Sequence, residues 1–127
     1  MPQRTLLLLA AIAAGFAQAP PPAPAVPVAP EDIAKLREAV KPLSAKVGAL
    51  RSHPLLADVA IYEKAVQNLL RYPDEFYSKD HLGFAHAAIA EGLKRADALE
   101  HRQSPWTTQT GRVFRAYQSR VDDSFQP

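Results

Sequence analysis

The chain has 127 residues, no cysteine, and a formal net charge of +2 from 15 basic and 13 acidic residues. It is long enough for one small domain, and the lack of cysteine excludes a disulfide framework, a thiolate nucleophile and a cysteine-ligated zinc site. The charges are nearly balanced and no basic cluster is interleaved with aromatic residues, which argues against a nucleic-acid-binding surface.

The first residues have the pattern of a secretory signal peptide. Arg4 supplies the positive start, residues 6–14 are uniformly apolar, and small residues follow. We predict a signal peptide over residues 1–17, with cleavage after Ala17 or, alternatively, after Ala19. An uncleaved membrane anchor is disfavoured because a spanning helix needs about 20 apolar residues, and this run is shorter. The chain is therefore expected to be exported, to the periplasm or the extracellular space, with no stable membrane anchor after cleavage.

Residues 18–30 form a Pro/Ala-rich segment that we predict to be a disordered linker. Half of the chain's 12 prolines lie between Pro20 and Pro30. Each proline fixes φ and lacks an amide donor, so neither a helix nor a central strand is favoured. An extended, polyproline-like tether is expected instead. The composition would also suit a ligand for a proline-recognition module, although composition alone is weak evidence for one.

The first predicted helix spans about residues 31–50. Glu31 and Asp32 place negative charge at its start, where the helix dipole is positive. Its apolar residues recur at steps of three or four and form one stripe that would face other helices; they are Ile33, Leu36, Val40, Leu43, Val47 and Leu50. Pro42 falls within this stripe without shifting its phase, which predicts one kinked helix and not two separate ones.

Two more helices are predicted. One starts between residues 55 and 58 and runs to about residue 71, and the other spans about residues 78–101. The second helix ends before Pro73, because a residue that precedes proline disfavours the α region. Ser78 suits the N-cap of the third helix. The apolar residues expected on the two buried faces are Tyr62, Ala65, Val66, Leu69 and Leu70, followed by Leu82, Ala85, Ile89, Leu93 and Ala96.

Two glycines lie within the third predicted helix. Gly83 and Gly92 either weaken that helix or let another helix approach it closely. The three helices together predict a mainly α fold, an antiparallel three-helix bundle over residues 31–103 with a kinked first helix.

Residues 104–127 differ in character from the helical part. β-branched and aromatic residues in a partly alternating run predict a strand over about residues 112–121, and Asp122-Asp123-Ser124 has the chemistry of a turn. No partner strand is predicted in this chain, and a lone strand leaves its backbone donors and acceptors unpaired. We therefore expect this tail to begin a truncated β-containing domain. A frayed tail or an edge strand in a homodimer is the alternative.

No constellation for catalysis, for a cofactor or for a metal ion is found in the sequence. His81 and His86 are five residues apart, about 140° around a helix, which is poor geometry for two ligands of one ion. The segment 105–111 is the most distinctive, because it holds the only tryptophan. We interpret Trp106 as a plug between the helices and the strand; a ligand-contacting loop is the alternative. The residues expected at a domain junction are Trp106, Thr108, Gln109, Tyr117 and Arg120.

Three stretches resemble a known family. Residues 53–59 (HPLLADV) and 61–65 (IYEKA) are similar to the helical N-terminal region of exported bacterial α/β-hydrolases of the prolyl-oligopeptidase-like or esterase type. Residues 105–111 (PWTTQTG) resemble the segment that joins that region to the hydrolase, and residues 117–127 (YQSRVDDSFQP) its first strand and turn. In that family a glycine is expected where Asp123 stands, which leaves the tightness of the turn open.

The resemblance implies that a serine hydrolase domain, with serine, acid and histidine in that order, would follow residue 127 as a partner in cis. None of the catalytic residues matches a position of this chain, so only the role of a non-catalytic accessory region is implied. A self-sufficient exported helical module for binding or assembly is the rival hypothesis. The two differ in whether the tail depends on a second domain.

Overall fold

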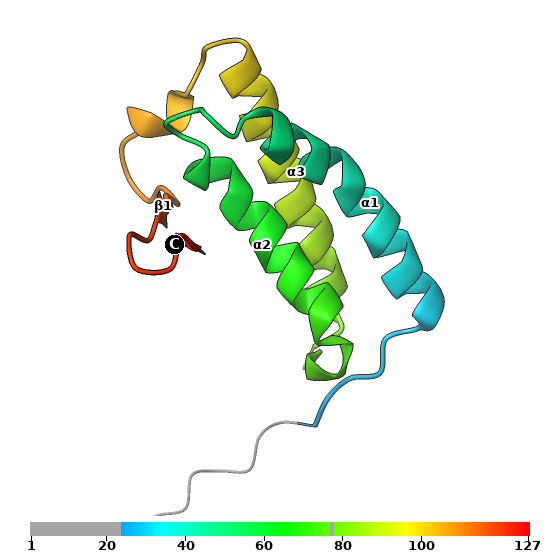
Figure 1. Ribbon diagram of the computed structural model, residues 1–127. Coiled ribbons are helices and arrows are strands. Elements are labelled where there is room, and N and C mark those ends of the chain that lie inside the picture. The colour runs from blue at the N-terminus through cyan, green and yellow to red at the C-terminus, as the bar shows by residue number, and fades with distance from the viewer. Residues whose placement is uncertain (1–23, 77) are drawn as a thin grey trace, which may run out of the picture.

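The computed structural model describes residues 24–76 and 78–127, in which three α-helices precede a small hairpin (Figure 1). The helices are α1 (Pro30–Ala49), α2 (Ala57–Arg71) and α3 (Asp80–Glu100), and the strands are β1 (Tyr117–Gln118) and β2 (Phe125–Gln126). Short 3-10 turns, η1 (Pro73–Glu75) and η2 (Pro105–Thr107), follow α2 and α3. The predicted signal peptide lies outside the described residues, as do residues 18–23 of the predicted linker.

The three helices run up, down and up beside one another, so the predicted antiparallel bundle is confirmed (Figure 1). The helix α1 is continuous through Pro42, as the unbroken phase of its apolar stripe predicted. The side chain at position 42 is exposed, so the proline takes no place in the core. A kink at this proline stays a prediction.

The core consists of two clusters along the bundle axis. The first cluster lies between the N-terminal halves of α1 and α3 and the C-terminal half of α2, and comprises Leu36, Val40, Val66, Leu70, Ala85 and Ile89. The second lies toward the other end and comprises Leu43, Val59, Ala96, Leu99 and Trp106. Eight of the sixteen apolar residues that helical spacing placed inside belong to these clusters, and seven more are partly buried and pack against them. Ala65 is an exception, because it is exposed on α2 although it was predicted to be buried.

Close packing of α3 against its neighbours depends on Gly92. A Cβ atom at this position would lie 2.9 Å from Cδ2 of Leu43 and 3.0 Å from Cβ of Tyr62, whereas a Cβ atom at Gly83 would meet nothing within 4 Å. Of the two interpretations of these glycines, close approach of a neighbouring helix is confirmed at Gly92 but not at Gly83.

The two glycines give a matched pair of substitutions. Gly92→Ala is expected to lower the free energy of unfolding by about 1–3 kcal/mol, because the added methyl group overpacks the core. Gly83→Ala is expected to raise it by about 0.5–1 kcal/mol through helix propensity. Urea denaturation of the two variants checks both values, and equal effects of the same sign would contradict the close approach.

The start of α3 uses Ser78 much as the sequence predicted. The Ser78 hydroxyl oxygen accepts a hydrogen bond from the amide of Asp80 at 3.2 Å. The bounds of α3 make Lys79, one residue later, the N-cap residue. This difference is within the usual spread of helix assignments. Before α1, the amide of Val26 donates to the carbonyl of Phe76, so the described end of the predicted linker touches the bundle.

The tail differs most from its prediction. Only Tyr117–Gln118 of the strand predicted over residues 112–121 is a strand, and it pairs antiparallel with Phe125–Gln126, Tyr117 opposite Gln126. The prediction of a strand without a partner in the chain is therefore wrong. The turn between the strands lies at residues 120–122 and overlaps the turn predicted at residues 122–124 only at Asp122. Asp123 has a φ of 55°, a left-handed conformation that aspartate tolerates better than most residues.

Candidate functional site

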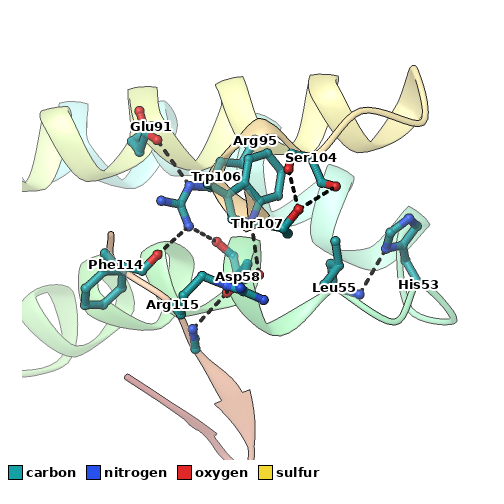
Figure 2. A network of polar contacts seen from close by, with 11 residues as sticks. His53, Leu55, Asp58, Glu91, Arg95, Ser104, Trp106, Thr107, Phe114 and Arg115 are labelled. Atoms are coloured by element: carbon teal, nitrogen blue, oxygen red, sulfur yellow. Dashed lines mark hydrogen bonds and ion pairs between the residues drawn. The ribbon is translucent and has the colours of Figure 1, made fainter. Parts of the chain in front are cut away.

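Asp58 connects the bundle to the tail. It lies in the first turn of α2 with 1% of its surface exposed. Its carboxylate accepts hydrogen bonds from Nε1 of Trp106 at 3.0 Å, from the amide of Ala116 at 2.8 Å and from Nε of Arg115 at 3.0 Å (Figure 2). Donors from η2 and from the segment before β1 thus converge on one side chain of α2.

These hydrogen bonds keep the Asp58 carboxylate charged. Burial by itself would raise the pKa of Asp58. The hydrogen bonds from the Ala116 amide, from Arg115 and from Trp106 outweigh burial and hold the pKa below its ordinary value. Asp58 is therefore an anion with three donors already bound, which leaves it poorly suited to accept a proton from a substrate.

Arg95 on α3 is the second buried charged residue here, with 6% of its surface exposed. Its guanidinium lies 5.1 Å from the ring centre of Tyr62 and 5.0 Å from that of Trp106, within the range of cation–π attraction. Nη1 donates to the carbonyl of Phe114 at 3.0 Å and to that of Asp58 at 3.3 Å.

The remaining Arg95 contact is with its own helix. Nε donates to Glu91 at 3.1 Å and forms an ion pair with it (Figure 2). We call Asp58, Arg95, Trp106 and Arg115, with the backbone of residues 114–116, the Asp58 cluster. The cluster joins α2, α3, η2 and the segment before β1 through hydrogen bonds and ring contacts.

The buried polar atoms of the Asp58 cluster find their hydrogen-bond partners within the chain. In residues 24–76 and 78–127, every buried side-chain nitrogen or oxygen atom has a hydrogen-bond partner. The same residues contain no group of three or more His, Asp or Glu side chains that could hold a metal ion. The cluster holds the segment before β1 against α2 and α3.

A second feature is an apolar groove of about 700 Å³ between α2 and α3. We call it the α2/α3 groove; its lining residues are Ile61, Tyr62, Lys64, Ala65, Val66, Asn68 and Leu69 from α2, Phe84, Ala85 and Ala88 from α3, and Phe114 and Pro127 from the tail. Phe84 is 65% exposed and Phe114 is 45% exposed. Exposed aromatic rings beside a groove are a common mark of a binding surface.

The residues predicted at the domain junction are only partly brought together. Trp106 is 6% exposed and packs in the second core cluster, as its interpretation as a plug requires. Thr108 and Gln109 are exposed on the loop after η2. Tyr117 and Arg120 are exposed on the hairpin, and neither contributes a side chain to the Asp58 cluster.

Sequence reasoning missed Asp58, Arg95 and Arg115. The burial of Arg95 could have been predicted, because Arg95 lies three residues after Gly92 and four before Leu99, on the buried side of α3. Asp58 stands in the apolar run LLADVAI, which is also informative, although an acidic residue in a first helical turn has an ordinary explanation in the helix dipole. Arg115 had no signal, since nothing in the local pattern pairs it with a residue 57 positions away.

Comparison with known families, with curated proteins and with solved structures finds no match to this chain. Within the part of the chain that the structure describes, no helix is long and apolar enough to cross a membrane.

Proposed function

We propose that this chain is an exported, non-catalytic helical accessory region of a larger serine hydrolase, either a peptidase or an esterase. The observation that carries the proposal is the Asp58 cluster. The bundle uses a buried carboxylate on α2 and a buried guanidinium on α3 to hold residues 114–116. The path of the chain into β1 is thereby fixed relative to the helices.

A fixed exit path is what an accessory region needs if it is to border the cleft of a domain in the same polypeptide. A flexible tether would let the two parts move independently. The hairpin supports the same role, because two strands of two residues each are marginal in water and gain stability from further strands. The resemblance of residues 105–111 and 117–127 to a hydrolase junction supplies the class of partner.

The rival function, a self-sufficient exported helical binding module, is favoured by a different observation. The tail is bound within the chain: Lys64 Nζ donates to the carbonyl of Phe125 at 2.5 Å, and β1 is paired with β2. The tail therefore has contacts within this chain, as a self-sufficient module would require.

A serine-reactive probe distinguishes the two functions. We would label the exported fraction of the producing cell with a fluorophosphonate and capture the chain under denaturing conditions with an antibody to residues 30–49. The expected result is a captured polypeptide larger than 13.9 kDa that carries the label, with labelling lost after prior heat denaturation. A captured species of 13.9 kDa or less without label would overturn the hydrolase proposal and leave the binding module.

The same capture tests export. Mass analysis of the captured amino terminus is expected to find Gln18 or Pro20 as the first residue. A chain that is recovered from the cytoplasm with residues 1–17 intact would contradict the proposed signal peptide.

A further inference from the structure

The α2/α3 groove has room along its length because several of its side chains are small. Ala65 on α2 and Ala85 and Ala88 on α3 line it, beside the exposed rings of Phe84 and Phe114. Its volume of about 700 Å³ lies within the range of about 300–1,000 Å³ that is usual for small-molecule sites. An unbranched apolar chain would fit a groove with this lining.

The groove has one cationic residue, Lys64. The Nζ atom of Lys64 donates to the carbonyl of Phe125 at 2.5 Å. A lysine ammonium group has three donors, so two remain for a ligand. Four other lysines of the described chain are ion-paired with carboxylates, namely Lys35, Lys41, Lys46 and Lys94. In residues 24–76 and 78–127, Lys64 and Lys79 are not among the lysines that form ion pairs, and of these two only Lys64 lines the groove.

We infer that the α2/α3 groove binds a long-chain fatty acid, with the alkyl chain along the alanines and phenylalanines and the carboxylate on Lys64. The complementary charge and the apolar lining select a ligand with one anionic end. A bound peptide would also need partners for its own amides and carbonyls, and beside Lys64 only Asn68 and Tyr62 bring polar side-chain atoms to this groove.

The test is calorimetric titration of the mature chain with octanoate, decanoate and dodecanoate, each below the concentration at which the acid aggregates. We expect saturable binding at one site. Affinity should rise about tenfold for each added pair of CH₂ groups, because each buried CH₂ group favours binding by a similar amount. Dodecylamine should bind at least tenfold more weakly than dodecanoate, because its ammonium group would face Lys64.

Two matched variants locate the site. Ala65→Phe fills the groove from an exposed position of α2 and is expected to weaken dodecanoate binding at least tenfold. Ala45→Phe places the same ring on an exposed position of α1, outside the groove, and should leave binding unchanged. Because both alanines are exposed, both variants should fold, which their circular dichroism and melting temperatures check.

Lys64→Met keeps the length of the side chain and removes its charge. We expect this variant to bind dodecanoate about tenfold more weakly and to lose the preference for dodecanoate over dodecylamine. Absence of saturable binding by the wild-type chain, equal binding of dodecylamine, or unchanged binding by Ala65→Phe would each overturn the inference. Binding of a helical peptide in place of the acid would do so as well.

Discussion

Replacement of Asp58 by alanine is expected to lower the free energy of unfolding by about 3–5 kcal/mol, because Asp58 is buried and each buried donor that loses its acceptor costs about 1–3 kcal/mol. The variant leaves three donors without their acceptor: the Trp106 indole nitrogen, the Ala116 amide and Nε of Arg115. Since small domains have only about 5–15 kcal/mol of stability in total, the variant should be close to unfolding at 25 °C. Urea denaturation followed by the fluorescence of Trp106, the only tryptophan, measures the effect.

Asp32→Ala is the matched control for this substitution. Asp32 also lies in the first turn of a helix, but its side chain is 41% exposed and its ion pair with Lys35 is on the surface. Surface ion pairs contribute about 0–1 kcal/mol, so the control should stay within about 1 kcal/mol of the wild type. Equal losses in the two variants would show that Asp58 acts only through the helix dipole.

The pH dependence of stability should also report on Asp58. The pKa of Asp58 in the folded chain is below its ordinary value of 3.8, so the unfolded chain takes up this proton first as pH falls. The contribution of Asp58 is therefore complete above about pH 5 and is lost as pH falls through 3.8 toward the folded pKa. Asp58→Asn should show a smaller loss of stability between pH 5 and pH 2 than the wild type. Parallel curves would contradict the assignment.

The helical part of this fold could be read from the sequence, because each helix has a stripe of apolar residues that recurs at the helical period. Leu36, Val40 and Leu43 are buried as that period requires. The error at Ala65 is of a different kind. Its spacing suits the buried side of α2, but its side chain is exposed and lines the α2/α3 groove.

The tail could not be predicted in the same way, because its backbone groups are bound by side chains from distant parts of the chain. The carbonyl of Phe114 is bound by Arg95, and the amide of Ala116 by Asp58. Such contacts leave no period in the local sequence. The β-branched and aromatic residues of the tail predicted a strand over about residues 112–121, but the strand is limited to Tyr117–Gln118, which pairs with Phe125–Gln126.

Trp106→Ala is expected to lower the free energy of unfolding by about 3–5 kcal/mol, which is typical for a tryptophan truncated in a core. The substitution removes the indole from the second core cluster, from the face of the Arg95 guanidinium and from the Asp58 carboxylate. Tyr72→Ala is the control, since this aromatic residue is 50% exposed and should cost less than about 1 kcal/mol. Far-UV circular dichroism in urea measures all variants, because Trp106→Ala has no tryptophan left.

Trp106→Phe separates the packing of the ring from its hydrogen bond. Phenylalanine retains most of the apolar contact but cannot donate to Asp58, so we expect a loss of about 1–3 kcal/mol, the cost of a buried charged acceptor that loses one donor. If the indole nitrogen holds the tail through Asp58, amide hydrogen exchange at residues 115–118 should accelerate more than exchange within α1. Uniform acceleration along the chain would mean that Trp106 stabilises the bundle as a whole and has no particular role in fixing the path into β1.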